Sequence, residues 1–214
     1  MKYDLHIHTK YSSDGVLEPA KIVKIARKVG LDGIAITDHA TIKGGVEAKK
    51  YETRDFKVIV GSEVMTERGE ITGLFLSREI NSRDVRDIIS EIKEQGGIVI
   101  IPHPFDRLRH SAFHPTEEDV KFIDALEVFN SRCVFQEDNR KALEFAKKQN
   151  LPIIAGSDAH FSNEIGNAGI VAGVEDLIEA ILSNSVDVFG RRSLLLNHAL
   201  TKALKIWRKT VNYG

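Results

Sequence analysis

Several features are scarce in this sequence, and each absence narrows the class of protein. Cys133 is the only cysteine among 214 residues, which excludes an internal disulfide framework and a thiolate metal cluster. The 30 Lys and Arg residues are balanced by 31 Asp and Glu residues, so no excess positive charge points to nucleic acid or an anionic membrane. No apolar run approaches the roughly eighteen residues of a membrane span, and no leader pattern is present. These absences favour a cytoplasmic protein.

Short β-branched segments alternate with amphipathic segments along the chain. Helical spacing, with Gly or Asn at the ends, predicts helices over residues 18–30, 82–97 and 135–150. Seven segments, several of them nearly continuous apolar runs, are predicted as strands: residues 3–8, 32–39, 57–64, 70–76, 97–103, 125–129 and 151–158. Strands interleaved with helices indicate a parallel α/β fold, and one continuous domain is expected at this length.

Polar residues gather where the predicted strands end. The clusters are HIH at 6–8, TDH at 37–39, GSE at 61–63, PHP at 102–104 and SDAH at 157–160. Alternate strand residues point the same way, so His6 and His8 project together. Any one histidine could be a hydrogen-bonded core residue. In a closed α/β barrel, however, the carboxyl ends of the strands meet at one mouth, and five clusters there favour a shared metal site.

The residue types at these positions indicate which metals would bind. Imidazoles and carboxylates without thiolates suit Zn, Mn or Fe. The candidate ligands are His6, His8, Asp14, His39, Glu63, His103, Asp158 and His160. This set is too large for one tetrahedral ion, so two or three divalent ions are predicted. A strand-end carboxylate such as Glu63 can bridge two ions and offset their repulsion.

Five motifs in a fixed order carry a family resemblance. DLHIHTKYSSDG, ITDH, GSE, PHPF and SDAH resemble the motifs of the PHP (polymerase and histidinol phosphatase) family of metal-dependent phosphoesterases, from Tyr3 to about residue 180. The resemblance implies a distorted seven-stranded (β/α)7 TIM-like barrel with the metal site at the C-terminal strand ends. It assigns ligands to three ions: His6, His8, Glu63 and Asp158 to the first; Asp14, His39 and His160 to the second; and Glu63 and His103, with a residue near the sixth strand, to the third.

The sequence departs from the family pattern in two places. Where many relatives have a histidine after the sixth strand, this chain reads ALEVFNSR, which leaves Glu127 or Asn130 as the third-metal ligand. A buried structural carboxylate is an equally good interpretation of Glu127. The doubled serine in SSDG also lengthens the gap between His8 and Asp14 relative to the shortest family form.

Substrate binding must come from individual cations, because the net charge provides no general attraction for a phosphate. Four basic residues follow or lie within the motifs and could bind phosphate oxygens: Lys10, Arg107, Arg109 and Arg132. Each, taken alone, is more often a solvated surface side chain.

The last segment is distinct from the predicted barrel domain of residues 1–190. An apolar helical stripe contains Leu196, Leu200, Ala203, Leu204 and Trp207, with Lys202, Lys205, Arg208 and Lys209 alongside. We expect residues 191–214 to form a basic amphipathic helix packed on the barrel or at an interface, where it could join two copies in a homo-oligomer. Contact with a membrane or nucleic acid is the weaker alternative.

Together these observations predict a metal-dependent hydrolase, a phosphoesterase or phosphatase. A metal-bound hydroxide would attack a phosphate mono- or diester, with Glu63, Asp158 and His160 as catalytic residues. Expected substrates are a nucleotide, a sugar or amino-alcohol phosphate, or an oligonucleotide end. Two alternatives stay open: hydrolysis of a C–N or ester bond at the same site, because the ions polarise a carbonyl equally well, and a non-catalytic PHP module associated with DNA polymerase or repair.

Overall fold

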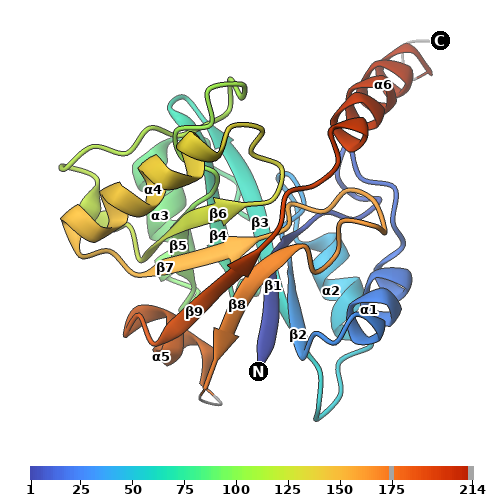
Figure 1. Cartoon of the computed structure of the whole chain (residues 1–214), viewed down its shortest axis with the longest axis horizontal. Helices are drawn as coiled ribbons and strands as arrows, with labels where there is room; N and C mark the ends of the chain where they lie inside the picture. Colours follow the sequence, from blue (N-terminus) through green and yellow to red (C-terminus); the bar gives the residue numbers. More distant parts are fainter. Residues whose placement is uncertain (174–175, 212–214) are drawn as a thin grey trace.

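The computed structural model describes residues 1–173 and 176–211, and these form one curved sheet surrounded by helices (Figure 1). The strands are β1 (Lys2–Ile7), β2 (Gly33–Ile36), β3 (Lys57–Thr66), β4 (Gly69–Leu74), β5 (Ile98–Ile101), β6 (Ala125–Asn130), β7 (Ile153–Gly156), β8 (Ala168–Ala172) and β9 (Val186–Gly190). The helices are α1 (Pro19–Lys28), α2 (Lys43–Lys49), α3 (Val85–Lys93), α4 (Gln136–Gln149), α5 (Leu177–Leu182) and α6 (Leu195–Val211), with a short 3-10 helix at Val120–Phe122.

The sheet curls into a nearly closed barrel. Its strand order is β7-β6-β5-β4-β3-β2-β1-β8-β9. The chain just past β7 returns to β1, where Ala159 bridges Ile7 in parallel and its carbonyl oxygen accepts from the His8 N–H at 2.9 Å. In Figure 1, α1 and α2 lie beside β1 and β2, whereas α3 and α4 lie beside β4, β5 and β6. The carboxyl ends of β1 and β7 are therefore neighbours, as a common site requires.

The predicted strands and helices are found, but the predicted (β/α)7 topology is not. The seven expected strands correspond to β1–β7, and the three expected helices to α1, α3 and α4. Within the described residues, β8 and β9 bring the sheet to nine strands. The pairs β1–β2, β2–β3, β5–β6 and β6–β7 are parallel, but β4 is antiparallel to both of its neighbours, and β8 is antiparallel to β1 and β9. The two-residue turn between β3 and β4 is too short for a crossover helix and forces the reversal.

The inside of the barrel is apolar at one end and polar at the other. On β3, Ile59 belongs to the interior core and Glu63, four residues later, lies in the polar cluster at the mouth, as period-two alternation requires. On β1, Leu5 belongs to the same core and His6 to the polar cluster, although the two are consecutive. A register shift between Asp4 and Ile7 accounts for this, because such irregularities redirect side chains.

The C-terminal helix α6 contacts the barrel through its polar face. Its apolar side chains face solvent: Leu196 is 64% exposed, Leu200 45% and Trp207 61%. Asn197 and Thr201, on its polar face, are buried against the barrel. Thr201 Oγ1 accepts there from Arg132 at 2.9 Å, and Asn197 Oδ1 accepts from Asn163 at 3.4 Å. No helix in the described part of the chain is both long and apolar enough to cross a membrane.

Candidate metal centre

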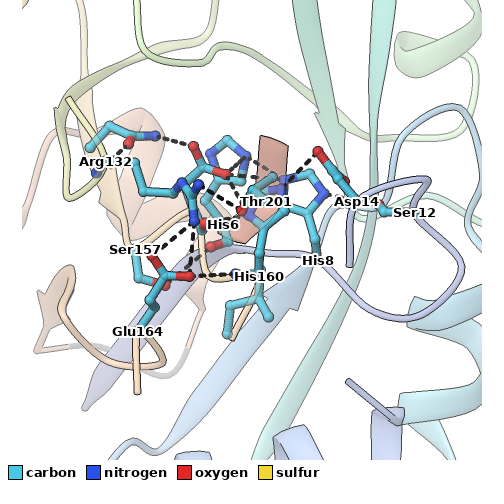
Figure 2. Close-up of polar contacts among 12 residues, drawn as sticks. His6, His8, Ser12, Asp14, Arg132, Ser157, His160, Glu164 and Thr201 are labelled. Atoms are coloured by element: carbon cyan, nitrogen blue, oxygen red, sulfur yellow. Dashed lines mark hydrogen bonds and ion pairs between the residues drawn. The ribbon is translucent and has the colours of Figure 1, made fainter. Parts of the chain in front are cut away.

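Side chains from several strand ends converge at the mouth of the barrel. All eight residues predicted as ligands lie there, seven of them buried and His39 partly exposed. Figure 2 shows His6, His8, Asp14 and His160 gathered at this point, and the Nε2 atoms of His6 and His8 are 3.2 Å apart. Because β1 and the segment after β7 are neighbours, residues about 150 positions apart in sequence become one cluster.

The first group of donors surrounds Asp14. His8, Asp14, His39 and His160 each offer one atom within 4.8 Å of the others. Asp14 Oδ2 lies 3.0 Å from His160 Nε2 and 3.4 Å from His39 Nε2. Three imidazoles and one carboxylate match the donor number and type of a tetrahedral divalent ion. The loop lengthened by the doubled serine therefore brings Asp14 to the cluster.

Further groups of donors share Glu63 and the two β1 histidines. His6, His8 and Asp158 form one group, and His6, Glu63 and His103 form another. Glu63 Oε1 is 2.9 Å from His103 Nε2, while its Oε2 is 3.1 Å from His39 Nδ1. The two oxygens of Glu63 thus face different histidines, which is the placement of a carboxylate that bridges two ions.

Glu70 belongs to the cluster and was not predicted. It forms a donor group with His39 and Glu63, and its oxygens lie 3.6 Å from His39 Nδ1 and 3.5 Å from His103 Nε2. In a parallel strand, Glu70 would lie at the closed end of the barrel, because it is near the start of β4. The antiparallel direction of β4 places that start at the mouth instead. A carboxylate in the otherwise apolar segment EITGLFL was the only available signal.

Several buried polar atoms of the cluster lack hydrogen-bond partners among the described residues. They are Asp14 Oδ1, Glu63 Oε2, Glu70 Oε2, His103 Nδ1 and Asp158 Oδ1. Buried carboxylate oxygens without a partner are costly unless a cation satisfies them. Four such oxygens beside imidazole nitrogens fit divalent ions well.

Burial opposes protonation of His6 and His39, but the neighbouring carboxylates outweigh it and raise the pKa of both imidazoles well above the usual value. The shifts of three other ligands favour the forms that bind metal. Burial opposes ionisation of Glu63, but His6, His103 and His39 outweigh it and hold its pKa well below the usual value. Burial likewise opposes ionisation of Asp158, but Arg109 and the neighbouring imidazoles hold its pKa low. Burial, and then His160, lower the pKa of His8 to about 3. Ionised carboxylates and a neutral imidazole are the forms that bind metal.

A layer of polar residues orients the ligands. Asp38 accepts from Thr9 N at 2.6 Å and from Ser12 Oγ at 2.9 Å, so it holds the loop after β1. Ser12 Oγ in turn lies 3.0 Å from His8 Nδ1 and accepts from His39 N at 3.0 Å. This arrangement directs the Nε2 atom of His8 toward the cluster.

The two candidates near the sixth strand, Glu127 and Asn130, also contact ligands. Glu127 Oε1 is 3.0 Å from His6 Nδ1, and its Oε2 accepts from His103 N at 2.6 Å and from Asn130 Nδ2 at 2.9 Å. Glu127 belongs to none of the groups of His, Asp and Glu donor atoms among the described residues. Both oxygens of Glu127 are thus occupied, and its position is that of a residue that orients His6 and His103.

The four predicted substrate cations have different surroundings. Arg109 contacts Asp158 and donates to Asp106 Oδ2 at 3.0 Å, so it reaches the cluster. Arg107 pairs with Asp138 at 2.7 Å, and Lys10 pairs with Glu18 at 2.7 Å. Arg132 is buried between Glu164 and Thr201 (Figure 2), and contacts each at 2.9 Å. A fifth cation, Lys205 of α6, lies 2.7 Å from Asp14 Oδ2 and was not predicted as a site residue.

Some known proteins are similar to this chain in sequence, and others are similar in fold. The model of a family described as PHP-associated matches residues 136–186. The uncharacterized protein MJ1587 of Methanocaldococcus jannaschii is 46% identical over 144 residues, which cover 61% of this chain and 82% of that protein. A structure from Bifidobacterium adolescentis, provisionally named a metal-dependent phosphoesterase, superposes with a TM-score of 0.66 at 21% identity over 86% of this chain and 96% of that one. An amidohydrolase from Chromobacterium violaceum with bound sulfate gives a TM-score of 0.62 at 18% identity over 78% and 90% of the respective chains.

Proposed function

Because the chain belongs to the PHP-domain family, we propose that it is a metal-dependent hydrolase and that its substrate is a phosphate ester. The observation that carries this proposal is the buried cluster of imidazoles and carboxylates, in which four carboxylate oxygens lack hydrogen-bond partners within the described chain. Bound cations would satisfy these oxygens and offset the cost of burying the carboxylates.

The donor groups divide the ligands among two or three ions. His8, Asp14, His39 and His160 would hold one ion, and His6, Asp158 and Glu63 a second. Glu63 and Glu70, with His39 or His103, would hold a third, and Glu70 would then supply the ligand that the sequence left to Glu127 or Asn130. When bound, such ions polarise a phosphoryl group and activate water for attack. Mn, Zn and Fe all suit this nitrogen and oxygen donor set.

The residues of the chain itself have separate roles in this proposal. Glu63, whose two oxygens face His39 and His103, would hold two ions together, and Asp158 and His160 would hold ions beside the loop after β7. Arg109 contacts Asp158 and presents a guanidinium beside the cluster. A guanidinium there can bind phosphoryl oxygens and stabilise the charge that develops on them during hydrolysis.

Hydrolysis of a C–N bond is the second candidate, and one comparison favours it. The Chromobacterium violaceum protein is named as an amidohydrolase, although its structure contains a sulfate. A non-catalytic module is disfavoured, because all eight residues predicted as ligands belong to the groups of donor atoms at the mouth of the barrel.

A substrate panel tests the proposal. Purified protein loaded with Mn, Zn or Fe is assayed for phosphate release from mononucleotides, sugar phosphates, histidinol phosphate, short 5′-phosphorylated oligonucleotides and model diesters, beside amide and carboxylic ester substrates. We expect phosphate ester hydrolysis that a chelator abolishes and that fresh metal restores. Turnover confined to amides would overturn the phosphate assignment. Metal-loaded protein that hydrolyses nothing, yet binds a polymerase, would indicate the non-catalytic module.

A further inference from the structure

The polar face of α6 lies over the loop that carries Asp14. Lys205 Nζ is 2.7 Å from Asp14 Oδ2. One turn further along the helix, Arg208 donates to the carbonyl oxygens of Ser12 and Gly15, both at 2.8 Å. These two backbone contacts lie on either side of Asp14 in the loop. The C-terminal helix is therefore part of the wall around the metal centre.

A second set of contacts connects α6 to the ligand His160. Arg132 donates to Thr201 Oγ1 on α6 and also pairs with Glu164, each at 2.9 Å (Figure 2). Glu164 Oε2 accepts from the backbone N–H of His160 at 3.0 Å. Since Arg132, Glu164 and Thr201 are all buried, this connection is shielded from water. The position of α6 is thus coupled to the position of a metal ligand.

The orientation of α6 is opposite to the one that burial of apolar area would favour. Leu196, Leu200 and Trp207 face solvent, whereas the side of the helix that bears Asn197, Thr201 and Lys205 faces the barrel. An amphipathic helix normally buries its apolar stripe, because that burial is the main source of its stability. Polar contacts with the metal centre therefore orient this helix, which is the arrangement expected of an element that contributes to a site.

Lys205 forms an ion pair with Asp14, and ions bound by Asp14 would change the interactions of its ammonium group. Its side chain is 48% exposed and reaches from solvent to Asp14, which is 2% exposed. An ion held by Asp14 repels the ammonium group, and the flexible stem allows Nζ to move away. An anion placed between Lys205 and the ions removes this repulsion.

We propose that α6 is a substrate-binding wall of the metal centre and that Lys205 binds a non-bridging phosphate oxygen of the substrate. This inference rests on the proposed phosphoesterase function and names the residue that recognises the phosphate. Lys205 adds a positive charge outside the ligand set, so it interacts more strongly with the dianion of a phosphate monoester than with the monoanion of a diester. It is therefore a specificity-determining residue that favours terminal phosphates.

Phosphate binding tests the inference without requiring turnover. Inorganic phosphate is titrated by calorimetry into the Mn-loaded full-length protein, and the metal content of every sample is measured. We expect Lys205→Met to weaken phosphate binding by about tenfold or more, the usual loss for one charge-assisted hydrogen bond, with unchanged metal content. Lys205→Arg should retain most of the affinity. Lys202→Met is the matched control, because Lys202 is an exposed lysine one turn earlier on the same helix.

Kinetics of the same variants provide a second readout. Lys205→Met should raise KM for a phosphate monoester, and should lower kcat/KM for the monoester more than for a diester. Unchanged phosphate affinity and unchanged monoester preference, with wild-type metal content, would overturn the role of Lys205 and leave the phosphoesterase proposal standing. A wild-type protein that binds phosphate through Lys205 but hydrolyses no ester would overturn the phosphoesterase proposal alone. A metal-loaded wild-type protein that binds no phosphate would overturn the inference.

Discussion

Glu127 Oε1 lies 3.0 Å from His6 Nδ1, within the buried wall of the barrel. A carboxylate accepts but does not donate, so Nδ1 of His6 carries the proton and Nε2 is left to bind metal. The same Glu127 accepts from His103 N, and so holds a second ligand. One carboxylate thus orients imidazoles from two different strand ends.

This contact predicts the effect of Glu127→Gln. The amide keeps the size of the side chain, but only its oxygen accepts hydrogen bonds. Its NH2 group therefore cannot replace the second acceptor oxygen of Glu127. We expect metal affinity to fall by about 10- to 100-fold while the protein stays folded, as for other residues that orient metal ligands. Competition with a fluorescent chelator measures the affinity. Glu144→Gln, which changes an exposed carboxylate on α4, is the control and should leave affinity unchanged. Wild-type affinity in Glu127→Gln would show that the contact does not support the site.

Glu63 and Glu70 should differ in how many ions depend on them. Glu63 faces His6, His39 and His103, so Glu63→Gln removes a carboxylate shared between sites. We expect it to lose more than one ion per chain, together with hydrolytic activity. Glu70 lies beside His39 and His103 only, and Glu70→Gln should lose one ion. Elemental analysis of the two purified variants measures this difference. Equal loss in both variants would contradict the bridging role of Glu63.

The loop beneath the ligands should be sensitive to packing at Gly44. A Cβ atom on Gly44 would overlap the carboxylate of Asp38 and the hydroxyl of Thr9, which hydrogen-bond to each other. We expect Gly44→Ala to reduce the free energy of unfolding by about 2 kcal/mol or more, measured by urea denaturation. Gly173→Ala is the control, because its added Cβ meets none of the described residues within 4 Å, chain neighbours apart. A Gly44→Ala variant as stable as Gly173→Ala would show that the loop accommodates the added methyl group with no loss in the free energy of unfolding.

One prediction concerns stability and pH outside the centre. Arg68 donates to both oxygens of Asp119, at 2.6 and 2.8 Å, and lowers the pKa of Asp119 to about 2, with burial opposing the shift. Because the folded pKa is below the unfolded one, the stabilisation is present above about pH 4 and is lost as the pH falls toward 2. Asp119→Asn should therefore cost about 1 kcal/mol at pH 7, allowing for the exposure of Arg68, and much less at pH 2.

Urea denaturation of wild type and Asp119→Asn at several pH values measures this difference. Glu117→Gln, on an exposed pair with Lys148, should change the free energy of unfolding by less than about 0.5 kcal/mol. A difference between wild type and Asp119→Asn that does not depend on pH would contradict the assigned cause.

Much of the site could be predicted because its ligands follow strands that parallel pairing brings together. His6, His8, Glu63 and Asp158 lie on or just after β1, β3 and β7, and the periodicity of an apolar strand is legible in the sequence. The same periodicity does not reveal whether β4 is parallel or antiparallel to its neighbours, because an apolar strand has the same pattern in either direction. Glu70 was missed for that reason, since only the β3–β4 hairpin places it at the mouth.

The role of the last helix was also beyond sequence reasoning. The stripe that contains Leu200 and Trp207 predicts an amphipathic helix, and α6 forms, but amphipathicity alone favours the opposite docking face. The contacts of Thr201 with Arg132 and of Lys205 with Asp14 join residues more than 60 positions apart. Such pairs have no local signature. Similarly, the motif position of Arg132 does not disclose that Glu164 and Thr201 surround its guanidinium.

The number of metal ions per chain tests the central claim most directly. The full-length protein is purified without added metal, loaded with Mn, Zn or Fe, freed of unbound ions and measured by elemental analysis beside Glu63→Gln. We predict two or three ions per wild-type chain, at most one in the variant, and chelator-sensitive phosphate release that follows the metal content. A folded wild-type protein that retains no ion after loading would contradict the assignment of the buried cluster as a metal centre.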